Sequence, residues 1–344
     1  MAHYANTVLL AALQDLQDQA NKDLRAPQYG ATRAFNDYKR NVILNFDAFQ
    51  NEEAEPDLRT RSVDYLRRDS QSVGTSRAAS LTGAMGTSTR DNLTFVTYSR
   101  EFTLSDDNAR NNTQGAAKQL AHQIRNARLD IGASIETAAI TKLEAFLNTV
   151  DVSSPMSNWS GASTYYNSVA NADEDRYFNI IEAEMMMRDY NGPLQLINYG
   201  TLNELKYWQT AQGAANSSNL QFQYGNKTMY TSNSITNSSD HIGTTYAVEE
   251  NSLALVDWIP AKNRNSLLNH GDFDFTQMPD PFGIFDRMAL ATQYKVQDSS
   301  SGGSDIGGNT QDAVWLYELS IDVAFFIPTI TTQKLVNKYV LSKT

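Results

Sequence analysis

The sequence predicts an α+β fold built around one long helix and long antiparallel strands. Residues 315–327 place an apolar side chain at every second position over thirteen residues, about twice the usual strand length of five or six. Residues 92–104, NLTFVTYSREFTL, are rich in the β-branched and aromatic residues that strands favour. Residues 109–147 carry one apolar stripe at helical spacing, made of Leu120, Ile124, Ile131, Ile135, Ala139, Leu143 and Phe146.

The residues before the long helix predict a shorter helix and a hairpin. Apolar positions in residues 4–24 fall on one helical face, and Pro27 with Gly30 then ends that helix. Residues 59–68 have the character of a strand that can pair with residues 92–104. The small and polar residues between them match no core pattern, so they predict a loop that projects from the body. We expect this hairpin and the N-terminal segment to bury their apolar residues mainly against neighbouring copies of the chain.

The long helix has a clear start and an unusual length. Ser105, Asp106 and Asp107 provide an N-cap and acids for the first turn. Nearly forty helical residues would span about 55 Å at 1.5 Å per residue, which is too long for the interior of a compact domain. We therefore expect the helix to act as a spine, with Gly115 and Gly132 as tolerated interruptions.

A mixed segment follows the spine. Residues 173–188 predict an amphipathic helix with Phe178 and Ile181 inward, and the run Met185 to Met187 is expected to fill gaps in the core. The later elements are a turn at 191–193, a strand through 194–197, a helix that carries Leu202, Leu205 and Trp208, and two further strands, one around 220–235 and one around 245–258.

The C-terminal part predicts a pair of long strands. Residues 288–296 alternate in the same way as residues 315–327. The linker between them, DSSSGGSDIGGNT, consists mainly of Gly and Ser and is typical of a flexible hairpin tip.

Composition limits the classes of function. The chain has 344 residues, no cysteine and a formal charge of −11. Without cysteine there are no disulfides or thiolate sites, so stability must come from packing, hydrogen bonds or neighbouring subunits. The acidic balance argues against a protein that coats nucleic acid, although it is compatible with a wall that encloses DNA without binding a particular sequence. No apolar run is long enough to span a bilayer, and the N-terminus lacks a basic leader, so we expect a cytoplasmic place of assembly.

Catalytic and metal-binding patterns are missing from the sequence. The four histidines lie far apart, and no phosphate-binding loop, dinucleotide fingerprint or nucleophile elbow is present. The acid pairs Asp272 with Asp274 and Asp298 with Asp305 are read as exposed turn residues rather than cation ligands. We therefore expect no enzymatic activity, no cofactor and no metal.

The order of these elements resembles the Hong Kong 97 fold of tailed-phage major capsid proteins and encapsulin nanocompartments. The strand NLTFVTYSREFTL leading into a capped spine helix looks like that family's return from its E-loop. The segment GPLQLINYGTLNEL is similar to the Gly-Pro, strand and helix pattern of its A-domain, and YAVEENSLALVDW looks like the strand that closes that domain. The resemblance implies an N-terminal arm at 1–55, an E-loop at 56–104, a P-domain formed by the spine at 105–150 and the strands at 285–344, and an A-domain at 151–284.

This resemblance implies a major capsid protein that assembles with itself into hexamers and pentamers of an icosahedral head around double-stranded DNA. A portal protein, and also scaffold or decoration proteins, would be its partners, and the virion its location. Two structural alternatives stay open: an encapsulin-like compartment shell, and a tail or baseplate protein. A glycan hydrolase with paired carboxylates is the enzymatic alternative, but no acid pair is marked out.

Arginine dominates the predicted hairpin, and residues 40–117 contain no lysine. Some members of the resembled family link a lysine of this loop to an asparagine of the next subunit, so the absence of lysine predicts a non-covalent shell. Arginine holds carboxylates through two parallel hydrogen bonds, which suits an interface that fixes orientation. We expect inter-subunit contacts at Arg67, Arg68, Arg77 and Arg90.

Overall fold

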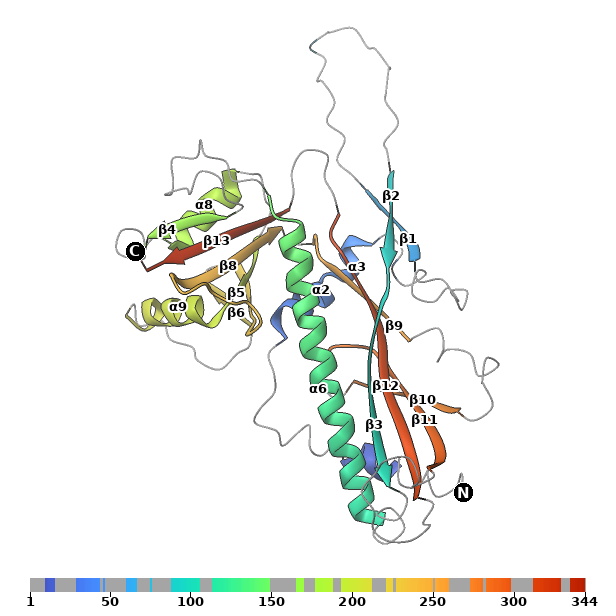
Figure 1. Cartoon of the computed structure of the whole chain (residues 1–344). Coiled ribbons are helices and arrows are strands. Elements are labelled where there is room, and N and C mark those ends of the chain that lie inside the picture. Colours follow the sequence, from blue (N-terminus) through green and yellow to red (C-terminus); the bar gives the residue numbers. More distant parts are fainter. Residues whose placement is uncertain are drawn as a thin grey trace.

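The structure of the chain is a computed structural model, and its elements are shown in Figure 1. Every structural statement below concerns the residues that it describes. These are 10–15, 29–43, 46, 60–66, 75, 88–105, 113–148, 165–169, 177–187, 193–211, 221–224, 227–249, 251–259, 273–280, 283–297, 312–328 and 335–343.

A long antiparallel sheet and the spine helix form the main body (Figure 1). The sheet has the strand order β10-β11-β12-β3, and a further strand, β9, pairs with the last residues of β12. The predicted C-terminal strand pair is confirmed, because β11 and β12 are antiparallel and β12 is 15 residues long. The bounds are β3 Val96–Ser105, β9 Ala254–Trp258, β10 Phe273–Met278, β11 Met288–Gln297 and β12 Asp312–Phe326.

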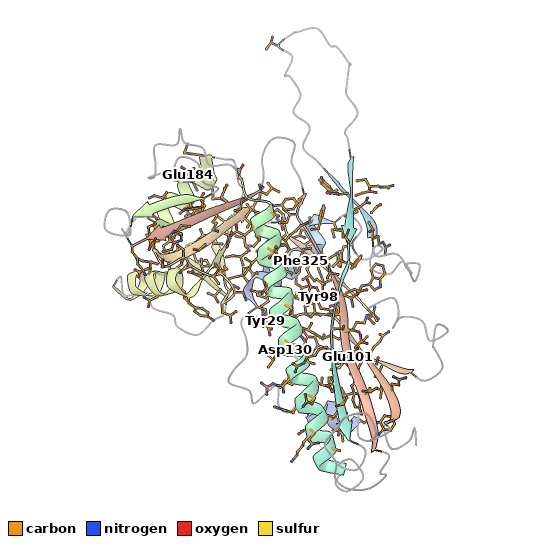
Figure 2. All side chains as sticks on the ribbon, viewed as in Figure 1. Tyr29, Tyr98, Glu101, Asp130, Glu184 and Phe325 are labelled. Carbon is orange, nitrogen blue, oxygen red and sulfur yellow. The ribbon has the colours of Figure 1, made fainter. Side chains whose placement is uncertain are left out.

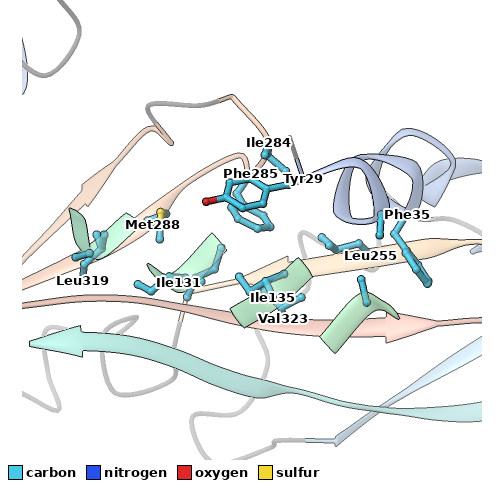
Figure 3. Close-up of a cluster of buried hydrophobic side chains, with 14 of the residues drawn as sticks. Tyr29, Phe35, Ile131, Ile135, Leu255, Ile284, Phe285, Met288, Leu319 and Val323 are labelled. Carbon is cyan, nitrogen blue, oxygen red and sulfur yellow. The ribbon is translucent and has the colours of Figure 1, made fainter. Parts of the chain in front are cut away.

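The spine helix is α6, Thr113–Ala145, and it lies along this sheet (Figure 1). Its 33 described residues span about 50 Å at the usual helical rise. The predicted stripe is confirmed, since its residues from Leu120 to Leu143 are at most 3% exposed. Figure 3 shows Ile131 and Ile135 of α6 among the side chains of β12 and neighbouring segments. The sheet and the helix therefore bury one another along most of their length.

A second sheet lies beside the upper half of α6 (Figure 1). Its order is β4-β13-β8-β5-β7-β6, and α8 and α9 pack with it around a separate apolar cluster. The predicted helices and the predicted strand through 194–197 are confirmed, whereas the regions 220–235 and 245–258 each hold two strands where one was expected. The bounds are β4 Tyr166–Val169, α8 Tyr177–Met187, β5 Pro193–Ile197, α9 Tyr199–Ala211, β6 Gln221–Tyr224, β7 Lys227–Thr231, β8 His241–Glu249 and β13 Val336–Ser342.

The expected division at residues 151–284 and 285–344 differs from the sheet topology. Strands β9 and β10 fall in the first range, yet they pair with β12 and β11 of the long sheet. Strand β13 falls in the second range, yet it pairs with β8 and β4 of the other sheet. The chain thus crosses between the sheets after β8 and again after β12. Alternation of apolar residues identifies a strand but not the sheet that it joins.

The methionine run on α8 is only partly in the core. Met185 is fully buried, as expected, whereas Met186 and Met187 are 66% and 57% exposed. Successive residues on a helix are about 100° apart, so three in a row span about 200° and cannot all face one sheet. The expectation for Met186 and Met187 was therefore wrong.

The N-terminal segment around α2 and α3 is part of the body rather than a free arm. Helix α2, Gly30–Asp37, places Phe35 in the core beneath α6, with its ring 5.0 Å from that of Phe325. Helix α3, Lys39–Val42, belongs with Phe46 to a second cluster against β9 and β12. The expectation that this segment buries its apolar residues mainly against other subunits is wrong for these residues.

The hairpin stem is likewise fixed to its own chain. It consists of β1, Thr60–Leu66, and β2, Ser88–Thr94, which pair antiparallel. Its inward side chains, Val63, Tyr65 and Leu93, are at most 3% exposed and pack with β9 and β12. The expected burial against neighbouring subunits is wrong for the stem, and the loop at residues 67–87 lies mostly outside the described part of the chain.

Candidate assembly site

The outward face of the hairpin stem is polar and internally paired. Arg90 donates to both carboxylate oxygens of Asp64, from Nε at 2.8 Å and from Nη2 at 3.0 Å. Beside this pair, Ser62 Oγ donates to Asn92 Oδ1 at 2.9 Å. The hydrogen bonds from Arg90 hold the pKa of Asp64 below its ordinary value. These cross-strand contacts keep the two strands of the stem in one register.

The inward face of the stem fixes its direction relative to the body. The ring of Tyr65 lies edge-on to Phe326 with centroids 5.4 Å apart, and Phe95 lies at the same distance from Trp258. The guanidinium of Arg61 lies 4.9 Å from the centroid of the Trp258 ring, within cation–π range. Aromatic contacts on two different strands of the body give the stem little freedom to swing.

Of the four predicted contact residues, the structure describes one. Arg67, Arg68 and Arg77 lie outside the described residues. Arg90 is exposed on the stem, and two of its donor nitrogens are engaged by Asp64 of the same chain. Its role at an interface stays a prediction. The sequence holds both residues of the pair, but only the hairpin register places Asp64 opposite Arg90.

Arg100 joins the long sheet to the spine helix. It lies on β3 and forms an ion pair with Asp130 of α6. Figure 2 shows Asp130 on α6 and Glu101 on β3 at the same level of the body. Because β2 runs into β3 with only Phe95 between them, this contact ties the strand that carries the hairpin to the spine.

A buried ion pair forms the first junction between α6 and a distant segment. Arg128 and Asp280 are both fully buried, and Arg128 donates from Nε at 2.5 Å and from Nη2 at 2.7 Å. Asp280 Oδ2 also accepts the backbone N–H groups of Ile284 and Phe285, at 3.0 and 3.1 Å. The guanidinium lies over the rings of Phe285 and Tyr29. One arginine therefore fixes the turn between β10 and β11 on the spine.

Gly132 makes room for this junction. A β-carbon at position 132 would approach Arg128 and Tyr29 to 2.6 Å. The hydroxyl of Tyr29 donates to the carbonyl of Leu129 at 2.9 Å, one turn before the glycine. The glycine expected to be a mere interruption of the helix is thus required where Tyr29 crosses it.

A buried carboxylate forms the second junction. Glu136 is fully buried, and its oxygens accept the backbone N–H groups of Ala31 and Thr32 at 2.9 and 2.8 Å. The hydroxyls of Thr32 and Ser232 donate to it as well, at 2.7 and 2.5 Å. The two N–H groups belong to the first turn of α2, where the helix dipole favours a negative charge. Glu136 therefore joins the spine, α2 and the end of β7 at one point.

A third junction lies near the end of the spine. Glu144 accepts a hydrogen bond from Tyr246 on β8 and another from Lys338 Nζ on β13, the latter at 2.6 Å. Burial, followed by the neighbouring Glu144, raises the pKa of Tyr246. The second sheet is thus attached to the helix by polar contacts as well as by apolar packing.

A fourth charged cluster connects α3 to the long sheet. Lys39 is nearly buried, and its Nζ lies 3.4 Å from Asp257 and 3.7 Å from Asp286. Asp257 Oδ2 accepts the backbone N–H of Asp286 at 3.1 Å. Burial raises the pKa of Asp257, and Lys39 only partly offsets this effect.

The described residues show structural contacts rather than reactive groups. They contain no group of three or more His, Asp or Glu side chains that could hold a metal ion. Within the same residues, no helix is long and apolar enough to cross a membrane. The acids Asp272, Asp298 and Asp305 lie outside the described residues. The absence of a metal site and of catalysis stays a prediction.

Comparison with known proteins gives matches at the level of structure. No family model matches this sequence, and no curated protein does. A chain from Mycobacterium phage Che8 is 10% identical with a TM-score of 0.45, over 88% of this chain and 90% of that one. A chain from Mycobacterium phage Bobi is 12% identical with a TM-score of 0.46, over 94% of each chain. A structure described as the capsid of Ralstonia phage GP4 is 10% identical with a TM-score of 0.46, over 94% of this chain and 93% of that one. Values this low assign no function, so the arguments below rest on the geometry of this chain.

Proposed function

We propose that this chain is the major capsid protein of a tailed phage, which assembles with itself into an icosahedral head around double-stranded DNA. The observation that carries the proposal is the hairpin stem, which is locked to the body by Tyr65 and Phe95 and ends at the pair Leu66 and Ser88. The 21 residues from 67 to 87 connect these two ends. A rigid stem that presents a long loop at a fixed angle is suited to reach a neighbouring copy.

The body itself supports a role as a building block. Contacts through Arg100, Arg128, Glu136 and Glu144 join helix α6 to β3, the turn between β10 and β11, α2, the end of β7, β8 and β13. These contacts hold both sheets and the N-terminal segment against one spine. A shell needs subunits whose surfaces keep a constant relative orientation, because an angular error repeats at every contact.

The contacts that we propose between subunits lie on the hairpin. Arg67, Arg68 and Arg77 would bind carboxylates of an adjoining subunit through paired hydrogen bonds. Arg90 would serve there with its remaining donor while it holds Asp64. Exposed acids on the long sheet, such as Glu101, are the kind of surface that these arginines would meet. The chain would act in the virion after assembly in the host cytoplasm, with a portal protein and scaffold or decoration proteins as partners.

Electron microscopy of the purified chain tests the function. We expect closed shells of hexamers and pentamers, and particles recovered from infected cells should contain DNA. Shells that enclose protein cargo instead would make the chain a compartment shell. Tubes or isolated rings would point to a tail component, and a persistently monomeric chain would refute the proposal.

Replacement of Arg67 and Arg68 by Ala tests the contacts. We expect fewer assembled shells and dissociation at lower salt, because exposed ion pairs weaken as ionic strength rises. Lys118→Ala with Arg287→Ala removes the same charge from exposed positions outside the hairpin and is the matched control. Helix content should be unchanged in both proteins. Equal yield and equal salt resistance of the two double variants would remove the arginines from the interface.

The proposed shell is held without covalent links, because residues 40–117 contain no lysine. Boiled particles should give a single electrophoretic band near 38.3 kDa. A ladder of multimers would contradict this point while leaving self-assembly intact.

A further inference from the structure

Two buried amide side chains flank Ala247 in the second sheet. Strand β8 lies between β13 and β5, with Asn337 opposite Ala247 on one side and Gln195 opposite it on the other. Residues directly opposite in neighbouring strands point to the same face of a sheet. Asn337, Ala247 and Gln195 therefore form one row, which Met229 of β7 extends.

This row lies in an apolar interior. Gln195 and Ala247 are fully buried, and Asn337 is 1% exposed. Helix α8 covers the same face with Ile181 and Met185, in the cluster that contains Ala247. The two amides are thus remote from bulk solvent.

The polar atoms of the row are incompletely satisfied within the protein. Asn337 Nδ2 lies 3.5 Å from the sulfur of Met185, a weak acceptor. Asn337 Oδ1 and both Gln195 side-chain atoms have no hydrogen-bond partner among the described residues. Buried polar groups in native proteins are nearly always hydrogen-bonded to protein or to ordered water.

The next row of the same face shows how a polar group here is normally satisfied. There Thr245 lies opposite Tyr339 and Ile197, and the hydroxyl of Tyr177 on α8 reaches Thr245 Oγ1 at 3.0 Å and the Tyr339 carbonyl at 3.2 Å. The helix supplies a bridging hydroxyl above Thr245. Above Ala247 the bridge must come from something other than the described side chains.

We propose that Asn337 and Gln195 form a binding site for an ordered water molecule above Ala247. Two strand spacings separate the residues, so their β-carbons lie about 10 Å apart. Ala247 contributes only a methyl group to the row between them. Water both donates and accepts, so it can donate to Asn337 Oδ1 while it bonds either end of the Gln195 amide. This site does not depend on whether the chain forms a shell.

Apolar replacement of the two amides tests the site through thermal unfolding of the full chain. Gln195→Met and Asn337→Leu nearly keep the shapes of the side chains while removing their hydrogen bonds. With a bound water, each single variant should lower the melting temperature by several degrees, because the water and the other amide lose a partner. The double variant should lose clearly less than the sum of the two. A higher melting temperature in either single variant, or a double variant whose melting temperature falls by the full sum of the two single decreases, would overturn the proposal.

A control and a direct observation complete the test. Met229→Leu changes an apolar side chain of the same row and should shift the melting temperature only slightly. An experimental map of the unaltered chain, at a resolution that shows ordered waters, should contain density within hydrogen-bond distance of Asn337 Oδ1 and the Gln195 amide. A map without that density would refute the site even if the variants fail to fold.

Discussion

Arg128 and Glu136 are fully buried charges on the same helix, and the protein satisfies them in different ways. Arg128 is paired with Asp280, an opposite charge that is also fully buried. Glu136 is held by neutral groups, namely two backbone N–H groups at the start of α2 and two hydroxyls. The first site is neutral as a whole, whereas the second keeps a net negative charge inside the core.

The difference shows what each site demands of the surrounding fold. The ion pair needs one well-placed side chain and the turn that carries it. The carboxylate needs the first turn of α2 to be formed and docked, since isolated N–H groups without the helix would offer neither the geometry nor the dipole. Gly30 permits this approach, because a β-carbon there would collide with the carbonyl of Thr231. Docking of the N-terminal segment and burial of Glu136 therefore occur together.

The largest effect is expected when the ion pair is broken on one side only. Asp280→Ala leaves Arg128 buried without its carboxylate and should lower the free energy of unfolding by about 3–5 kcal/mol. Replacement of both residues, Arg128→Met with Asp280→Leu, should recover part of that loss, because no buried charge remains. The rest should persist, because the N–H groups of Ile284 and Phe285 still lack their acceptor. Urea unfolding of the two variants measures both values. If the double variant were as unstable as Asp280→Ala, the ion pair would do more than offset the cost of burying its two charges.

The Glu136 site should respond differently to a nearly isosteric change. Glu136→Gln places an NH₂ group among four donors and should cost about 1.5–3 kcal/mol, the range for hydrogen bonds to a charged group. Limited proteolysis should then cut first near residues 29–43, since α2 loses its anchor. Thr32→Val removes one hydroxyl of the same site and should cost about 1 kcal/mol without exposing the segment. Unchanged proteolysis of Glu136→Gln would separate the carboxylate from docking.

Much of the fold could be predicted from the sequence because its longest elements have strict periodicity. The stripe of α6 and the alternation of β12 each extend over more positions than chance would give, so both were recognised. Sheet membership was not accessible, because β9 and β10 look like any half-buried strands until their partners are known. Burial of α2 and the hairpin stem was missed for the same reason, since their partners are distant in sequence.

One feature of the sequence does indicate a charged junction on the spine. The apolar stripe passes from Ile124 to Ile131 with a gap of seven, and Arg128 occupies the missing position. A charged residue on the buried stripe of a helix indicates a buried partner. The identity of that partner, Asp280, could not be inferred, because it depends on how the strands of the long sheet pair.

Glu144 provides an intermediate case between the two sites. It is held by a cation, Lys338, and by a neutral donor, Tyr246. Tyr246→Phe should cost about 1 kcal/mol, because the ion pair remains. The folded protein holds the phenol proton more tightly than the unfolded chain, in which the pKa of the phenol is near 10.0. Its contribution to stability is therefore lost as the pH rises above 10.0, and the Phe variant should lose less stability there than the unaltered chain.

The smallest effect concerns Asp257. Like Asp280 it has a cationic partner, and like Glu136 it accepts a backbone N–H group. Despite Lys39 and the N–H of Asp286, burial keeps the pKa of Asp257 above its ordinary 3.8. The folded state therefore binds the proton more tightly than the unfolded state. The stability linked to this proton is fully present below pH 3.8, the ordinary pKa of the carboxyl group, and it falls as the pH rises through the elevated pKa.

Asp257→Asn isolates this proton, because all other titrating groups are common to both proteins. We expect the unfolding free energy of the unaltered chain, relative to that of the variant, to decrease from about pH 3 to about pH 7. Urea unfolding at several pH values measures the difference. An increase with pH would mean that Lys39 outweighs burial, and Asp257 would then resemble Asp280 in its ion pair with Arg128. A flat difference would mean that the carboxyl titrates alike in both states, so that neither its cation nor its burial distinguishes the folded chain from the unfolded one.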